Sequence, residues 1–394
     1  MKEIYLKNYK MKIKTEAPVF IGDGSKIGKK EFIYMERKNK VGILNMPAFF
    51  HYLEENRLEV PYMDYVLEAG NKDLGRWLNE NKISGSEYGK FLKYTLDAGD
   101  ALIDVRGNNS SRDYRGKRSA KAKEIFCFVK DAEGMPYVPG SSIKGMIRTA
   151  LLAWEIGQND DIRKEHAENI SREISRSMDK RKYFLNKQTS ELETEVFHTI
   201  ERKDIKKSIE IPKQNAVCSN MSGLLVSDSA PINTSCLTLC QKIDLSVDGK
   251  EKPLPLLREA LRPGSDIFFD ITIDPGVFPY EIEDILEALD YYQKILYSNF
   301  YSFFDRGSSK KGTVWLGGGC GFPAKTVIES LYPEKKKEAK ITSDIFRKTL
   351  GKNYEIHKHS DDVIKYEISP HVCKCTKYKG QIYDMGRCTI SILE

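Results

Sequence analysis

The sequence predicts an α+β fold in which an antiparallel sheet carries helices on one face and large helical insertions interrupt the core. Three observations predict it. Strand-like and helix-like segments alternate irregularly, without the regular β–α repetition of a parallel sheet. Residues 158–211 are highly charged and mostly helical, which is typical of an insertion. The chain of 394 residues, 40% of them hydrophobic, can bury a sizeable core.

The first half of the chain begins with strand signals and continues with helical ones. Residues 11–21 predict a strand that enters a glycine loop, IGDGSKIG, and residues 31–44 predict a hairpin. Helical signals dominate from residue 46 to about residue 95. After a basic segment, EIFCFVK at 124–130 predicts a strand, and an amphipathic helix is expected over 141–156.

Strand signals return after the charged insertion in LLVSDSA, CLTLCQKIDLS and DIFFDITID. A long amphipathic helix is expected over residues 280–304, followed by the glycine-rich GTVWLGGGCGF and a short helix over 323–331. The remaining residues mix lysines, a helix and a final strand-like stretch. Two halves with a β–α–β pattern are typical of a ferredoxin-like or RNA-recognition-type core.

These segments predict a single module, 1–394, with a discontinuous core. The core is expected over residues 1–45, 124–157 and 222–332. The parts outside it are a helical insertion with the basic loop, a charged helical insertion and a C-terminal appendage, at 46–123, 158–211 and 333–394.

Composition excludes several classes of protein. No apolar run approaches the roughly 18 residues that span a bilayer, and the N-terminus has no apolar signal region, so the cytoplasm is the expected compartment. The eight cysteines are expected to be free thiols. One cluster lacks the paired C-x2-C spacing of a zinc ribbon, so no metal is expected at His371, Cys373, Cys375 and Cys388.

The positive charge is concentrated in residues 106–123, whose net charge of +6 equals that of the whole chain. This segment is rich in Gly, Ser and Asn and has no apolar period, which indicates a loop. It is either a solvated charge run or an arm that lies along a phosphate backbone. The arm is favoured, because basic segments often order on nucleic acid. Its candidate RNA contacts are Arg112, Arg115, Lys117 and Arg118.

A second candidate site lies in YVPGSSIKGMIRTALL, residues 137–152. Ser141 or Ser142 can cap the helix, and the remaining first-turn N–H groups favour an anion. Lys144 and Arg148 share a face one turn apart, and Gly145 lets another backbone approach. A phosphodiester site and an ordinary capped helix explain this stretch equally well.

The same residues also match, weakly, the S-x-x-K pattern of serine acyl-enzymes, through Ser141 and Lys144. Residues 227–229, SDS, loosely echo the second element of that pattern, but the third, K-T-G, is missing. This interpretation is therefore disfavoured.

A third candidate site has four glycines in five positions, Gly317, Gly318, Gly319 and Gly321, with Lys325 close behind. Each glycine costs backbone entropy, so such a run indicates a backbone that lies against a ligand or forms an anion-binding nest. The run lacks the spacing of a P-loop or a dinucleotide site, so no cofactor is expected.

In this order, IGDG with Gly22 and Gly24, PGSSIKGMIR and GGGCGF resemble the RAMP superfamily of CRISPR proteins, over nearly the whole chain. The chain is most similar to subunits of type III-A (Csm) effector complexes. The resemblance implies a subunit that grips guide RNA (crRNA) without reading its bases, caps the complex near the crRNA 3′ end and supports crRNA maturation in antiviral defence. It implies a neighbouring backbone RAMP subunit as partner, and it leaves the small helical subunit and host nucleases open as further partners. No membrane partner is expected.

The resemblance also bears on catalysis. Target-cleaving relatives carry an Asp on the loop after the first strand, where this sequence reads Lys29, Lys30 and Glu31. Asp23 lies earlier, and the first histidine, His51, falls in a predicted helix. We therefore expect a binding subunit without catalytic residues. The alternative is a metal-independent endoribonuclease of the same superfamily.

Overall fold

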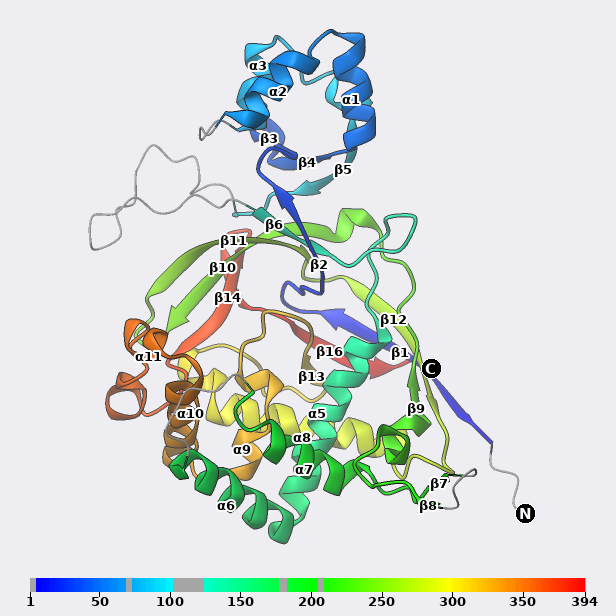
Figure 1. The fold of residues 1–394 in the computed structure, drawn as a ribbon, viewed down its shortest axis with the longest axis vertical. Helices are drawn as coiled ribbons and strands as arrows, with labels where there is room; N and C mark the ends of the chain where they lie inside the picture. Colours follow the sequence, from blue (N-terminus) through cyan, green and yellow to red (C-terminus); the bar gives the residue numbers. More distant parts are fainter. Residues whose placement is uncertain (1–4, 69–72, 102–123, 177–182, 205–208, 394) are drawn as a thin grey trace.

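A five-stranded sheet organises the core, with the order β13–β16–β1–β12–β9 and every neighbouring pair antiparallel. The structure is a computed structural model that describes residues 5–68, 73–101, 124–176, 183–204 and 209–393 (Figure 1). The strands of this first sheet are β1 (Lys7–Thr15), β9 (Leu224–Val226), β12 (Asp266–Ile273), β13 (Thr313–Trp315) and β16 (Arg387–Ile392).

Side chains alternate along β1 between a polar face and the core. Met11 and Ile13 are fully buried, whereas Lys10 and Lys14 on either side of them are exposed. Two helices, α5 (Gly140–Gln158) and α8 (Ile282–Asn299), contribute to the same hydrophobic core as these strands (Figure 1). One face of the sheet is thus covered and the other is polar, as is common for antiparallel sheets. The predicted antiparallel sheet with helices on one face is confirmed.

A second, larger sheet is mixed, with the order β2–β6–β11–β10–β5–β4–β3. The pairs β10–β5 and β11–β6 are parallel, and β14 and β15 extend the sheet beside β10. Its strands are β2 (Gly22–Gly28), β3 (Phe32–Met35), β4 (Lys40–Leu44), β5 (Leu92–Asp97), β6 (Glu124–Phe128), β10 (Leu237–Ser246), β11 (Glu251–Leu261), β14 (Val372–Tyr378) and β15 (Gln381–Asp384).

The segment after β4 forms a distal module with a hydrophobic core of its own, visible at the top of Figure 1. It holds α1 (Met46–Glu55), α2 (Glu59–Leu67) and α3 (Leu74–Glu80). Aromatic rings fill its centre, with 5.2 Å between the ring centroids of Phe49 and Tyr62 and 5.3 Å between those of Tyr62 and Trp77.

One sequence expectation is wrong at the base of this distal module. Residues 92–97 form strand β5, although helical signals were expected to continue to about residue 95. The hairpin of β3 and β4 borders both cores: Val41 and Ile43 pack into the main core, and Ile33 and Leu44 pack into the distal core. The strands of the second sheet therefore continue from the main body into the distal module.

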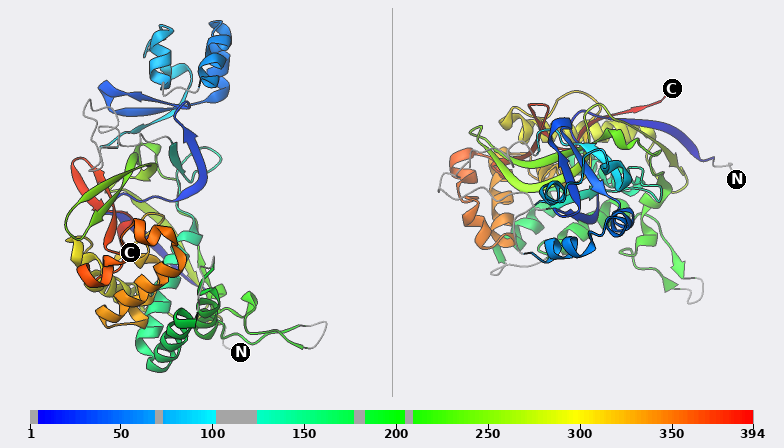
Figure 2. Two further views of the ribbon diagram at one scale, coloured as in Figure 1. Left: turned by 60° about the vertical axis from the view of Figure 1, so that its left-hand side comes forward. Right: turned by 90° about the horizontal axis from the view of Figure 1, so that it is seen from above.

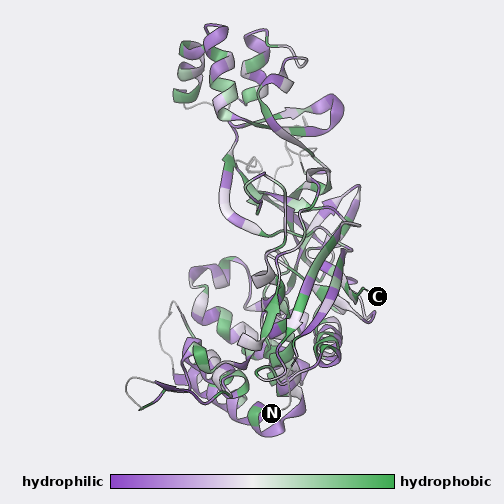
Figure 3. Cartoon of the chain, turned by 90° about the vertical axis from the view of Figure 1, so that its right-hand side faces the viewer, coloured by the Kyte–Doolittle hydropathy of each residue, from purple (hydrophilic) through white to green (hydrophobic). Residues whose placement is uncertain are grey.

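The charged segment forms α6 (Asp160–Arg176) and α7 (Asn186–Phe197), which confirms its helical character. It ends in a two-stranded element, β7 (Lys203–Asp204) and β8 (Ile209–Glu210), that projects from the body in the left view of Figure 2. Figure 3 shows that this projection is largely hydrophilic, whereas hydrophobic residues concentrate along the central strands. Among the described residues, no helix is long and apolar enough to cross a membrane.

The C-terminal residues are more than an appendage. After α9 (Ile328–Leu331), α10 (Lys335–Thr349) and α11 (Lys352–Ile356), the chain returns through β14 and β15 to the first sheet. Strand β16 then lies between β1 and β13, with Cys388 and Ile390 buried. Its partner β1 is at the opposite end of the sequence, so no local signal indicates the pairing.

Candidate nucleic-acid interface

The glycine run follows β13 and packs against the segment after β1. Gly317, Gly319 and Gly321 have φ angles of 84°, 141° and 92°, a region that favours glycine. A Cβ on Gly317 would lie 2.3 Å from the carbonyl oxygen of Phe20, and the Gly318 N–H donates to that oxygen at 2.6 Å. Close backbone packing therefore explains much of the glycine content of this run.

Gly318 is different from its neighbours in the run. Its φ is not positive, and the nearest atom to a Cβ there would be Phe20 Cδ1, at 3.4 Å. Gly318 therefore has room for a small side chain, and a structural reason alone does not require glycine at this position.

Arg258, on β11, lies beneath the glycine run. Its Nη1 would lie 3.1 Å from a Cβ on Gly319, and its guanidinium carbon is 4.9 Å from the ring centroid of Phe20. Its Nη1 also donates to Met385 Sδ at 3.7 Å, and its buried Nε meets no hydrogen-bond acceptor among the described residues. The arginine thus brings a positive charge and an unmatched donor to the backbone of the glycine run.

Sequence reasoning missed Arg258 because β11 itself was not predicted. The strand contains Pro253 and Pro255, and proline within a run argues against a central strand. The available signal for a buried strand with a charged residue was the arginine within the mostly apolar stretch LLREAL, residues 256–261.

The N-terminus of α5 is capped, but not by the expected serines. The Gly140 N–H donates to Asp228 Oδ1 at 2.8 Å, whereas no side chain of the helix itself caps it. A Cβ on Gly140 would lie 2.2 Å from the carbonyl oxygen of Val226, so the helix begins in close contact with β9. Ser141 is exposed and Ser142 is half-buried. The anion at this helix terminus is therefore a carboxylate of the chain, which satisfies part of the charge preference.

Lys144 and Arg148 both contact other parts of the chain. Lys144 Nζ donates to the Leu224 carbonyl oxygen at 2.7 Å, and burial, followed by the charge of Arg148, lowers the pKa of Lys144. Arg148 Nη2 pairs with Glu193 Oε2 at 2.6 Å. The hydrogen bond from Lys144 to Leu224 also occupies the amine that an acyl-enzyme would need as a base for Ser141. Gly145 has no atom within 4 Å of a would-be Cβ, so no other part of the described chain approaches it closely.

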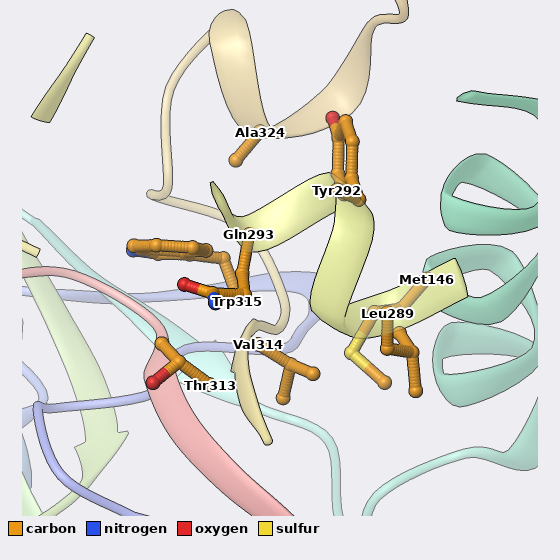
Figure 4. A pocket seen from close by; sticks show the side chains of 8 residues that line it. All are labelled: Met146, Leu289, Tyr292, Gln293, Thr313, Val314, Trp315 and Ala324. Atoms are coloured by element: carbon orange, nitrogen blue, oxygen red, sulfur yellow. The ribbon is translucent and has the colours of Figure 1, made fainter. Parts of the chain in front are cut away.

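A small cavity lies between α5 and the segment around the glycine run (Figure 4). Its volume of about 10 Å³ suits a single water. The buried Gln293 Oε1 and Thr313 Oγ1 have no hydrogen-bond partner among the described residues, and both residues line the cavity. Met146 of α5 and Ala324, just after the run, line its other sides. The second and third candidate sites therefore lie on adjacent elements.

The remaining predicted positions surround this region or fall outside the described residues. Gly22 and Gly24 lie in strand β2, at a register irregularity opposite β6, and not in a loop as expected. Lys325 is exposed at the end of a short 3₁₀ helix, Pro323–Lys325. The basic positions Arg112, Arg115, Lys117 and Arg118 lie outside the described residues.

A sequence model of the RAMP superfamily matches residues 12–368. The chain belongs to this superfamily.

Relatives match this RAMP protein over 92% to 100% of its length. The chain is 27% identical to "CRISPR system Cms protein Csm5" of Mycobacterium tuberculosis strain H37Rv, covering 98% of each chain. Identity to the proteins of the same name is 26% for Enterococcus italicus, covering 92% of this chain and 93% of the relative, and 27% for Streptococcus thermophilus, covering 100% and 99%.

Solved structures share the fold of this RAMP protein. One is a chain of a "Csm-crRNA-target RNA ternary complex in type III-A CRISPR-Cas system", with a TM-score of 0.60 and 18% identity, covering 98% of this chain and 100% of that chain. The other is the crystal structure of T.onnurineus Csm5, with a TM-score of 0.57 and 18% identity, covering 96% and 99%.

The three residues considered for catalysis in this RAMP protein make separate local contacts. Asp23 Oδ1 accepts from the Ser25 backbone N–H at 2.7 Å, and Glu31 Oε2 accepts from the Gly28 N–H at 2.6 Å. His51, on α1 of the distal module, is exposed and lies 3.3 Å from Glu55. Each side chain is thus explained by its own turn or helix surface.

The predicted free thiols are confirmed, since all eight cysteines are unpaired. Cys373, Cys375 and Cys388 are fully buried in the strands. A hydrogen bond with Cys375 and, second, burial raise the pKa of the Cys373 thiol well above its ordinary value. His371 faces a different group of residues, described below.

Proposed function

We propose that this RAMP protein is a non-catalytic crRNA-binding subunit of a type III-A Csm effector complex. We place it at the crRNA 3′ end, where it caps the complex and supports crRNA maturation. The observation that carries this proposal is the similarity to proteins named Csm5, which covers between 92% and 100% of the chain. The complex that shares this fold is described with crRNA and target RNA, which supports the same assignment.

The core of the first sheet is, in this proposal, a ferredoxin-like module of the RNA-recognition type. The elements β1, α5, β9, β12, α8 and β16 follow one another in a β–α–β–β–α–β order. Their strands lie in the order β16–β1–β12–β9, with antiparallel neighbours, which is the fourth–first–third–second order of that fold. Strand β13 then adds an edge strand beside β16.

The crRNA backbone, we infer, passes over the glycine run. Half-buried Arg258 supplies a positive charge beside the run, and exposed Lys325 adds a second cation. Ser141 and Ser142 with the adjacent Lys144 and Arg148 line the neighbouring stretch of the path, and the basic segment 106–123 supplies a further grip. Phosphate contacts carry no base information, so guides of different sequence should bind alike.

Arg258→Ala tests this path. Loss of a charge-assisted hydrogen bond costs about 1.5–3 kcal/mol, so crRNA affinity should fall about tenfold or more for every guide. The salt dependence should flatten by about 0.7 in slope for one lost single-strand contact. Arg258→Lys should keep the slope, because the charge remains. Fluorescence anisotropy across a salt series measures both quantities.

Arg76→Ala is the matched control, since Arg76 is an exposed arginine that pairs with Glu80 on the distal module. It should leave crRNA affinity unchanged. Equal weakening by both variants, or none by Arg258→Ala, would contradict the proposed path. The same reactions, run with and without divalent metal, should return intact crRNA precursor. Cleavage that Asp23→Ala, Glu31→Ala or His51→Ala abolishes would instead support the endoribonuclease alternative.

A further inference from the structure

Three ligand-type side chains converge where the C-terminal helices meet the second sheet. The ligand atoms of His359, Asp362 and His371 all lie within 4.8 Å of one another. Asp362 is fully buried and is the first residue of a π-helix, Asp362–Tyr366. Single π-helical turns are rare and frequently mark functional sites.

The two imidazoles approach different oxygens of the same carboxylate. His359 Nδ1 lies 3.0 Å from Asp362 Oδ2, and His371 Nδ1 contacts Asp362 Oδ1. Two ring nitrogens and two carboxylate oxygens therefore face one another in a single group. Two imidazole nitrogens and one carboxylate are three ligands of a four-coordinate metal site that water would complete, and binding would release the protons now held between nitrogen and oxygen.

Surrounding residues fix these side chains in place. The Ser369 hydroxyl donates to Asp362 Oδ2 at 2.6 Å. The ring of His371 stacks on Tyr366, with 5.1 Å between centroids and 14° between planes, and the ring of His359 lies 4.9 Å from that of Phe346. Such outer contacts orient ligands in metal sites. The side chain of His371 is 12% exposed, which gives an ion a way in.

We propose that His359, Asp362 and His371 bind one zinc ion, which fastens the C-terminal helical segment to the start of β14. Imidazole nitrogen with carboxylate oxygen suits zinc, whereas calcium and magnesium prefer oxygen ligands throughout. The site joins residues 359–362 to His371, directly before a strand that pairs with β10. A bound ion would therefore stabilise the path by which the chain returns to β16.

The site differs from a thiol site on the same strand. Cys373 follows His371 by two residues, but its thiol hydrogen bonds to Cys375. Within the described part of the chain, the His359, Asp362 and His371 group is the one that brings three such ligand atoms together, and no cysteine belongs to it. Spectroscopy can separate the two sets, because thiolate ligands give cobalt a strong charge-transfer absorption that nitrogen and oxygen ligands do not.

The test begins with the full chain, purified without a histidine tag and supplied with zinc. Elemental analysis should find about one zinc per chain, since the group offers a single site. His371→Asn and Asp362→Asn should lose it. His357→Ala should retain it, because His357 is an exposed histidine outside the group. Ser369→Ala should retain the ion with affinity lowered about 10- to 100-fold, the usual effect of losing an outer contact.

Two further measurements keep the result clear if a variant folds poorly. Zinc added to chelator-treated parent protein should raise its melting temperature, and cobalt should give d–d absorption without a thiolate band. Parent protein that takes up no zinc even in excess would overturn the proposal, as would undiminished zinc in His371→Asn. A thiolate band, or zinc lost in Cys373→Ser and kept in Asp362→Asn, would also overturn it.

Discussion

At the scale of single residues, a buried acidic pair has consequences for stability. Glu329 on α9 and Glu338 on α10 are each 4% exposed. Burial raises the pKa of Glu338 to about 7, and burial, followed by the charge of Glu338, raises that of Glu329 well above its ordinary value. Both carboxyls therefore favour the protonated form in the folded protein. At a pH between the unfolded and folded pKa values, the folded protein holds these protons, whereas the unfolded chain has released them.

This proton binding predicts how stability changes with pH. Because the pKa of Glu338 rises from 4.5 to about 7 on folding, the folded state should lose stability as pH rises through that window. Glu338→Gln keeps an acceptor for the Thr342 hydroxyl, which donates to Oε1 at 2.8 Å, and cannot ionise. At about pH 8 this variant should be more stable than the parent by up to about 3 kcal/mol, and at about pH 4.5 the two should be equal.

Thermal melting of both proteins across this pH range measures the effect. Glu334→Gln is the control, because Glu334 is exposed at the start of the same helix. Its melting temperature should follow that of the parent at each pH. A Glu338→Gln variant that parallels the parent at every pH would show that the carboxyl ionises without cost.

At the scale of elements, the glycine run combines two roles that substitution can separate. Gly317 has positive φ and touches backbone, so Gly317→Ala should cost about 1–3 kcal/mol of stability. Gly318→Ala should melt like the parent, because its Cβ finds ordinary contact distances. Gly318→Val should then weaken crRNA binding at every salt concentration, since a steric clash is not screened by ions. If Gly318→Val binds like the parent throughout, the run is a structural turn and the proposed path over it is wrong.

The elements also show why sequence predicts some of this site and not the rest. Helix α5 was predicted because its apolar residues recur at helical spacing, and Ile143 and Ile147 are indeed buried. Its cap was not, because Asp228 is 88 residues from Gly140 in sequence. Arg258 was not predicted as a site residue, because it lies on β11 and the two prolines of that segment argue against a strand. Local periodicity therefore predicts elements, whereas contacts between distant segments decide which polar groups remain available.

The same limit holds for the glycine motifs. Four glycines in five positions predicted a close backbone approach, and the structure has one, between Gly317 and Phe20. The approaching backbone belongs to the chain itself, which composition alone cannot distinguish from a ligand. Similarly, His371 was considered with Cys373 on the basis of spacing, but its neighbours come from the helical segment at 359–362.

At the scale of the whole molecule, the parts that extend beyond the first sheet are unlike one another. The distal module has its own core, the charged insertion projects β7 and β8, and the C-terminal helices occupy a third position (Figure 2). A filament that grows along RNA needs one heterologous interface that repeats from subunit to subunit. A capping subunit instead needs one face for its neighbour and other faces that end growth. The proposed role therefore makes a prediction about stoichiometry.

The number of these chains bound per crRNA should not increase with the length of the RNA. Mass photometry with guides of increasing length should find about one chain per guide, because a repeating interface is required for more. The control adds the backbone RAMP subunit of the same complex, whose number should grow with guide length while that of this chain stays constant. Negative-stain microscopy should show no long filaments of this chain alone. Chain numbers that rise in proportion to guide length, with filaments visible, would assign this protein to the repeating backbone instead of the cap.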